Sequence, residues 1–343
     1  MVQICLFGAG RIGRDHAWRV AQSNNGKLYC VVDPDLEAAR KTAEEHRAIV
    51  YKSAGEALAD PKVEAVLIAS TSDTHVDLII ASAQAGLPIF CEKPIDLDME
   101  RIERCLEVVE AKNVPLFVAF NRRFDPSFQM LKQRLDAGEV GKVEQLILTS
   151  RDAPFPPLSY LKRSGGLFCD MTIHDFDMAR WLLGEEPYEI YATGSVLIDK
   201  ELSNFNDIDT AMVVMKTRSG VLCQINNSRR SAYGYDQRIE IFGEKGMLRA
   251  NNVVPTTLEF SFGQGVKTDR ALQSFPERYR EAYQREIDHF IDEVVIAKRP
   301  PAITGYDGKQ AILLAHTANA SLRSQSPCYL GETAPSYHKR IEV

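Results

Sequence analysis

The stretch VQICLFGAGRIG, residues 2–13, decides the fold of the first third of the chain. It joins a short apolar run, typical of a buried strand, to the glycine pattern G-x-G-x-x-G. A helical pattern continues to about residue 23, and the next strand pattern, KLYCVVD, ends at Asp33. A strand, a glycine turn and a helix in this order predict a βαβ unit that binds a dinucleotide.

Each glycine of the pattern has a physical reason. Gly8 permits a tight turn, Gly10 lets the backbone approach a pyrophosphate, and Gly13 lets the helix pack closely on the strand. The helix N-terminus favours the phosphate charge, so that Arg11 and Ile12 in the first turn are also candidate cofactor contacts.

Asp33 lies at the distance along the chain expected for a carboxylate that accepts the two adenosine ribose hydroxyls. The residues after it, Pro34 and Asp35, offer no arginine for a 2′-phosphate. The sequence therefore favours NAD over NADP as the cofactor.

Strand and helix patterns then alternate up to residue 120, which predicts a doubly wound parallel sheet. Ligands of such sheets bind beyond the carboxyl ends of the strands. The polar residues at those ends are candidate cofactor-binding residues: Thr71, His75, Glu92, Lys93 and Arg122. Lys93 stands out because Pro94 follows it at the end of an apolar strand, which aims the lysine side chain into the crevice.

The alternation of strand and helix patterns ends after residue 120. Most of residues 188–262 reads as successive strands separated by glycine or polar turns, which predicts an open, largely antiparallel sheet. The expected architecture is an N-terminal Rossmann domain (1–120), a C-terminal α+β domain for substrate binding and oligomerisation (121–330), and a polar tail (331–343). An active site is expected between the two domains.

The segment GGLFCDMTIHDFDMARWL, residues 165–182, reads as an amphipathic helix. On a helical wheel, Asp170, His174 and Asp177 lie on one stripe, opposite an apolar side that faces a core. Such a stripe alone is typical of a solvated face. A catalytic metal site usually has another histidine or cysteine, so no metal is expected here.

Composition excludes several classes of protein. A net charge of −6 argues against a broad nucleic-acid surface, and no apolar run is long enough for a membrane span. The seven cysteines include no C-x-x-C pair, and the N-terminus has no basic region typical of a secretory signal. A cytoplasmic location without membrane or nucleic-acid partners is expected.

With GAGRIG, Asp33, CEKP and DMTIHDFDMARWL in this order, the chain resembles the glucose-fructose oxidoreductase/inositol dehydrogenase/rhizopine catabolism (Gfo/Idh/MocA) family of NAD(P)-dependent oxidoreductases. The resemblance covers the whole chain except the tail. The segments most similar to the inositol-oxidising members are AFNRRFD (119–125), SGGLFCDMTIHDFDMARWLLGEEP (164–187) and NNSRRSAYGYDQRIEIFGEKGML (226–248).

This resemblance implies catalytic roles for Lys93, Asp170 and His174. A neutral histidine can accept the hydroxyl proton of a secondary alcohol, and a cationic lysine can stabilise the alkoxide that develops. The aspartate can orient the imidazole, stabilise its charged form or bind a substrate hydroxyl. The candidate substrate-binding residues are Lys93, Arg123, Asp152, Asp170, His174 and Tyr235.

The expected function is NAD-dependent oxidation of a cyclic polyol, with myo-inositol favoured by the loop similarity and 2-keto-myo-inositol as the product. Another inositol isomer or a pyranose sugar is the alternative substrate, and a non-catalytic NAD-sensing regulator is a remoter alternative. The resemblance also implies a homotetramer.

Overall fold

The first sheet is formed by the N-terminal third of the chain. In the computed structural model, which describes residues 1–331, its six parallel strands have the order β3-β2-β1-β4-β5-β6. The strands are β1 (Val2–Phe7), β2 (Gly26–Val32), β3 (Ile49–Tyr51), β4 (Ala65–Ile68), β5 (Ile89–Glu92) and β6 (Leu116–Ala119). This order confirms the predicted doubly wound Rossmann sheet.

Helices cover both faces of this sheet: α1 (Arg11–Gln22), α2 (Leu36–His46), α3 (Ala54–Leu58), α4 (His75–Gln84) and α5 (Met99–Lys112). Every residue of β4 and β6 is buried, as expected for parallel strands packed on both sides. Asp35 and Asp98 begin α2 and α5, where each carboxylate accepts two main-chain N–H groups. Gly10, the N-cap residue of α1, has no side chain to cap the helix, which leaves the first N–H groups of α1 available.

The second sheet has seven strands in the order β12-β11-β7-β10-β9-β8-β15. They are β7 (Val143–Arg151), β8 (Pro187–Ser195), β9 (Thr210–Thr217), β10 (Leu222–Ser228), β11 (Asp236–Gly243), β12 (Gly246–Ala250) and β15 (Cys328–Tyr329). Only the pair β7 and β10 is parallel among these strands, so the prediction of a largely antiparallel sheet is confirmed.

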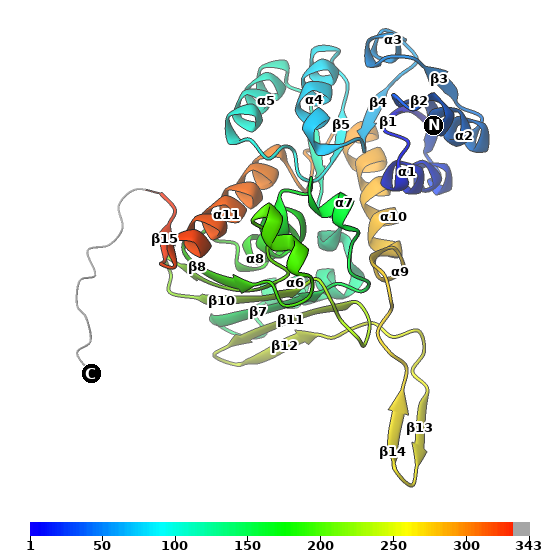
Figure 1. The fold of residues 1–343 in the computed structure, drawn as a ribbon. Helices are drawn as coiled ribbons and strands as arrows, with labels where there is room; N and C mark the ends of the chain where they lie inside the picture. Colours follow the sequence, from blue (N-terminus) through cyan, green and yellow to red (C-terminus); the bar gives the residue numbers. More distant parts are fainter. Residues whose placement is uncertain (332–343) are drawn as a thin grey trace.

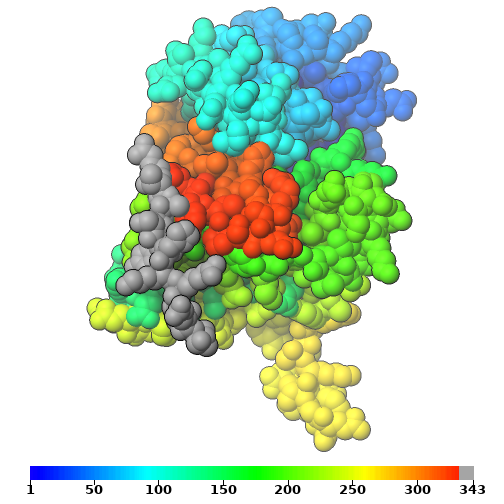
Figure 2. All heavy atoms as spheres, turned by 60° about the vertical axis from the view of Figure 1, so that its left-hand side comes forward, coloured from blue at the N-terminus to red at the C-terminus, as the bar shows by residue number. Residues whose placement is uncertain are grey.

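Helices α6 (Pro126–Asp136), α7 (Leu158–Leu161), α8 (Ile173–Leu183) and α11 (Gly305–Ser324) lie between the two sheets in Figure 1. Within the described residues, no helix covers the opposite face of the second sheet (Figure 1). A hairpin of β13 (Glu259–Phe262) and β14 (Gly265–Thr268) stands clear of the body of the molecule (Figure 2).

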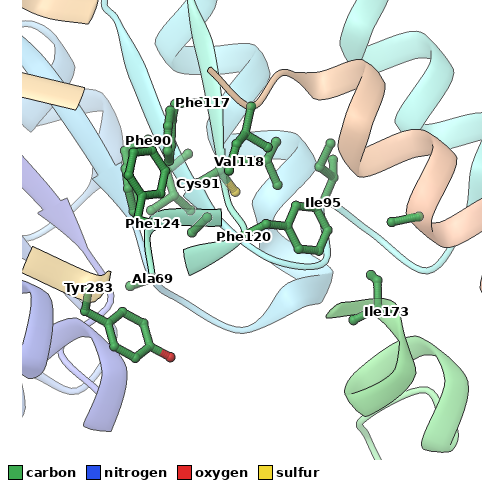
Figure 3. Packing of buried hydrophobic residues seen from close by; sticks show 14 of the residues in the cluster. Ala69, Phe90, Cys91, Ile95, Phe117, Val118, Phe120, Phe124, Ile173 and Tyr283 are labelled. Atoms are coloured by element: carbon green, nitrogen blue, oxygen red, sulfur yellow. The ribbon is translucent and has the colours of Figure 1, made fainter. Parts of the chain in front are cut away.

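The chain returns to the first sheet after the hairpin. Helices α9 (Phe275–Arg278) and α10 (Arg280–His289) lead into a π-helical segment, Phe290–Ile296. The rings of Phe90 and Phe290 lie 5.6 Å apart, and a Cβ on Gly26 would meet Ile291. Residues assigned by sequence to the second domain thus complete the core of the first sheet, where Figure 3 shows Phe90 and Phe117 stacked.

The segment that carries Asp170 is π-helical over Phe168–Thr172 and becomes α-helical at Ile173. Single π-helical turns often mark functional sites. Gly331 is the only residue of the predicted tail within the described residues, and the rest of that prediction lies outside them. Among residues 1–331, no helix has both the length and the apolar character needed to cross a membrane.

Candidate active site

The glycine turn fits a dinucleotide. A Cβ on Gly13 would lie 1.9 Å from the main-chain oxygen of Gly8, and one on Gly8, whose φ is +97°, would lie 2.6 Å from the amide nitrogen of Ser70. A Cβ on Gly10 would meet nothing within 4 Å. Gly8 and Gly13 thus allow close packing, whereas Gly10 faces the open space in which a pyrophosphate would lie at the start of α1.

Asp33 lies beside this turn. Its Oδ2 accepts a hydrogen bond from the amide of Ala9 at 2.6 Å, and its Oδ1 accepts one from the amide of Asp35 at 2.8 Å. The carboxylate is therefore held at the glycine turn, on the side of β2 where the adenosine ribose is expected. Arg11 is exposed, with its guanidinium 5.0 Å from the ring centre of Phe275, and Ile12 is half-buried.

Lys93 and Asp170 meet between the two sheets. Lys93 follows β5 and Asp170 precedes α8, yet the lysine Nζ donates to the main-chain oxygen of Asp170 at 2.9 Å. The same Nζ lies 3.8 Å from the Asp170 carboxylate. Both side chains are mostly buried. The structure therefore brings together the two residues that the sequence could relate only through separate motifs.

Two residues that the sequence analysis did not identify hold the Asp170 carboxylate. The hydroxyl of Tyr160 donates to Oδ1 at 2.5 Å, and Nη1 of Arg229 donates to Oδ2 at 2.9 Å. Burial would raise the pKa of Asp170, but the charges of Lys93 and Arg229 and these hydrogen bonds hold the pKa below its ordinary value. Asp170 is therefore an anion near neutral pH.

His174 has a different environment on the same helix. Its Nδ1 is buried without a hydrogen-bond partner, and the ring of Phe120 lies edge-on at 6.0 Å. Burial lowers the pKa of His174 well below the ordinary value, and the charges of Lys93 and Arg122 lower the pKa further. The imidazole is therefore neutral and can accept a proton.

Asp152 is half-buried and Tyr235 is buried. Burial raises the pKa of Asp152 to about 6, and the negative charge of Asp170 contributes, whereas Arg229 opposes the shift. Tyr235 packs edge-on against Tyr279 at 6.0 Å.

Arg123 does not join this group. Its guanidinium forms a two-pronged ion pair with Asp177 and a third contact with Asp307 of α11. Asp177 has no exposure to solvent, although the helical wheel places it on the polar stripe. These contacts engage Nε and Nη2 of Arg123 with two carboxylates and favour a structural role, and substrate binding by Arg123 stays a prediction.

The other candidate residues differ in burial and in their hydrogen-bond partners. Arg122 is buried and donates to Asp175 at 2.7 Å. The ring nitrogens of buried His75 lie 2.8 and 3.1 Å from the main-chain oxygens of Pro94 and Ser70. Thr71 is exposed and Glu92 is half-buried. Within residues 1–331, no group of three metal-ligating side chains is found.

Comparisons with known proteins identify the family of the chain. Residues 2–120 match the family model of an oxidoreductase family with an NAD-binding Rossmann fold, and residues 128–249 match that of the GFO/IDH/MocA C-terminal domain. The chain belongs to the Gfo/Idh/MocA family of oxidoreductases. It is an enzyme of the oxidoreductase class with NAD as its cofactor.

Two similar relatives cover almost the whole chain. Myo-inositol 2-dehydrogenase of Thermotoga maritima is 45% identical over 96% of this chain and 99% of its own length. Inositol 2-dehydrogenase of Rhizobium meliloti is 47% identical over 94% and 97% of the two chains.

Two similar crystal structures come from Lactobacillus casei. Myo-inositol dehydrogenase in complex with NAD(H) and myo-inositol is 26% identical, with a TM-score of 0.88 and 99% and 100% coverage of the two chains. Scyllo-inositol dehydrogenase with NAD(H) and scyllo-inositol is 28% identical, with a TM-score of 0.90 and 96% and 99% coverage.

Proposed function

We propose that the protein is an NAD-dependent dehydrogenase that oxidises a secondary alcohol of a cyclic polyol, with myo-inositol as the favoured substrate and 2-keto-myo-inositol as the product. The observation that carries the proposal is the meeting of Lys93, from the nucleotide-binding sheet, with Asp170 at the start of the helix that carries His174. The names of the two relatives at 45% and 47% identity support the choice of substrate.

His174 is the general base of the proposed reaction. His174 is half-buried and its imidazole is neutral, so the exposed part of the ring can take the hydroxyl proton. A base placed in this way contributes a factor of about 10²–10⁴ to the rate. Asp170 cannot serve as the base, because it is an anion with a lowered pKa whose two oxygens already accept hydrogen bonds.

Lys93 stabilises the negative charge that develops on the substrate oxygen as the proton leaves. Asp170 positions the lysine by its main-chain oxygen and balances its charge at 3.8 Å. NAD, when bound, would supply the acceptor for the hydride of the carbon that carries this oxygen. The protein groups therefore handle the proton and the oxygen charge, and the alcohol becomes a ketone.

A polyol needs several hydrogen-bonding partners, and the proposed site supplies them around Asp170. Asp152 and Tyr235 are the sequence candidates, and Tyr160 and Arg229 are added by the structure. A second candidate substrate is another isomer such as scyllo-inositol, supported by the structural similarity to scyllo-inositol dehydrogenase.

A panel of substrates tests this proposal. The purified protein is mixed with NAD or NADP and with myo-inositol, scyllo-inositol, chiro-inositol or glucose, and NADH or NADPH absorbance is followed. The expected result is the highest kcat/KM for myo-inositol with NAD. A higher value for another member of the panel would reassign the substrate. Binding of NADH with no turnover of any polyol would instead support an NAD-sensing regulator.

We also propose that the protein forms a homo-oligomer, a tetramer by its family resemblance, through the uncovered face of the second sheet. The exposed apolar side chains on that face are Tyr191, Met212, Val214, Leu222, Phe242 and Met247. The hairpin adds exposed Phe260 and Val266, and an isolated hairpin is at best marginally stable in water. Sedimentation equilibrium tests the proposal, and a monomer that stays active at micromolar concentration would overturn it.

A further inference from the structure

His16 and Glu92 form a hydrogen-bonded pair next to Lys93, and this pair has no part in the proposed proton transfer. His16, on α1, has no exposure to solvent, and its Nε2 lies 2.7 Å from Oε1 of Glu92. The other oxygen of Glu92 accepts a hydrogen bond from the main-chain amide of Lys93. The pair therefore connects the helix at the glycine turn to the end of β5.

The hydrogen bond of this pair has a definite direction. An ionised carboxylate only accepts hydrogen bonds, so Nε2 of His16 carries the proton and donates to Glu92. Burial would raise the pKa of Glu92, but the bond from His16 and nearby positive charges lower it, so the carboxylate is ionised.

Other charged groups lie close to this carboxylate. Asp170 pairs with both Lys93 and Arg229, so it does not neutralise Lys93 alone. Buried Arg19 is paired with Asp15. Glu286 of α10 is fully buried and neither of its carboxylate oxygens has a partner. Burial and the charge of Glu92 raise the pKa of Glu286, so Glu286 is neutral. Glu92 is thus the ionised carboxylate of this cluster that lies at the carboxyl end of β5.

Glu92 lies where its negative charge can act on a bound cofactor. Its side chain is 14% exposed at the carboxyl end of β5, beside the catalytic lysine. In a sheet of this strand order the reactive end of the dinucleotide lies over the carboxyl ends of the strands. The nicotinamide ring is a cation in NAD⁺ and is neutral in NADH, so a fixed anion at this edge interacts differently with the two forms.

We propose that Glu92, held in place by His16, makes the site bind the oxidised cofactor in preference to the reduced one. Glu92 discriminates by charge, and His16 is a positioning residue that acts through it. A group that stabilises bound NAD⁺ relative to bound NADH also promotes release of the reduced cofactor after each oxidation. The inference rests on the NAD site of the proposed function and is independent of which alcohol is oxidised.

Equilibrium binding without any polyol tests the proposal. The Kd of NAD⁺ and of NADH is measured by calorimetry for the wild type, Glu92→Gln and the control Glu107→Gln, which removes an exposed carboxylate from α5. We expect Glu92→Gln to raise the Kd of NAD⁺ about tenfold and to change the Kd of NADH less than about twofold. The control should leave both values unchanged. An equal loss of both affinities, or an unchanged ratio, would overturn the proposal.

Two variants of His16 test whether it positions Glu92. His16→Phe fills the space beside Phe90 and Tyr283 but removes the hydrogen bond, and it should shift the NAD⁺ to NADH ratio in the direction of Glu92→Gln. His16→Gln can still donate, and it should restore most of the wild-type ratio. A wild-type ratio in His16→Phe would refute the positioning role. Because no alcohol is present, these outcomes stand apart from any failure of the proposed substrate.

Discussion

Nη1 of Arg229 donates to Oδ2 of Asp170 at 2.9 Å, although the two residues are 59 positions apart in the chain. The arginine side chain has no exposure to solvent. A hydrogen bond between buried charged groups is stronger than one between neutral groups, so this contact helps decide the protonation state of Asp170.

Replacing Arg229 should therefore change the pH dependence of the enzyme. Arg229 lowers the pKa of Asp170, so Arg229→Met should raise that pKa. The ionised carboxylate is then lost at a higher pH as the solution is acidified, and the acid limb of kcat/KM should move to higher pH. Arg229→Lys keeps a cation and should show a smaller shift. The exposed neighbour Arg230 supplies the control, Arg230→Met, and an acid limb that stays in place in Arg229→Met would contradict the assignment.

His174→Ala should lower kcat by about 10²–10⁴ while leaving the Kd of NAD within about twofold, because the general base is lost and the nucleotide site is untouched. Single-turnover kinetics and cofactor titration measure the two effects. His46→Ala, at the end of α2, is the matched control. Turnover within tenfold of the wild type would show that another group accepts the proton.

Asp152 should make substrate affinity depend on pH near 6. Its pKa is raised to about 6 by burial, so the carboxylate becomes protonated as the pH falls through that value. A neutral acid is a weaker acceptor for substrate hydroxyls, and KM should rise below pH 6. Asp152→Asn should have a raised KM that no longer changes between pH 5 and 7. A wild-type KM that is flat across this range would exclude Asp152 from substrate binding.

Arg123 should be needed for stability rather than for substrate binding. Arg123→Met leaves the fully buried Asp177 without its main partner, and breaking such a pair costs about 3–5 kcal/mol of unfolding free energy. Urea unfolding measures this cost, and Arg123→Met/Asp177→Leu should lose less than Arg123→Met alone. KM for the polyol should change less than about twofold. A large rise in KM without loss of stability would restore the original prediction.

The parts of the site that follow local patterns could be predicted from the sequence. The glycine turn and Asp33 lie within one βαβ unit, whose spacing indicates both the fold and the ligand. Lys93 comes at the end of a buried strand, and Asp170 and His174 share one helical stripe. In each case the pattern that identifies the residue lies within a short segment of the sequence.

The missed residues depend on contacts between distant segments. Arg229 and Tyr160 reach Asp170 from the end of β10 and from the short helix α7, and no periodicity relates them to it. The pair Arg229-Arg230 at the end of a predicted strand was the one feature of the sequence that indicated a positive charge near the site. The ion pair of Arg123 with Asp307 was hidden for the same reason, because Asp307 lies 184 positions later.

The return of the chain to the first sheet has a consequence for biosynthesis. Phe290 and Ile291 are fully buried, and Phe290 packs against Phe90 inside the nucleotide-binding half. The N-terminal third that leaves the ribosome first therefore lacks part of its own core. The nucleotide-binding domain reaches its final packing only after the second sheet has been synthesised, so the two domains must complete their folding together.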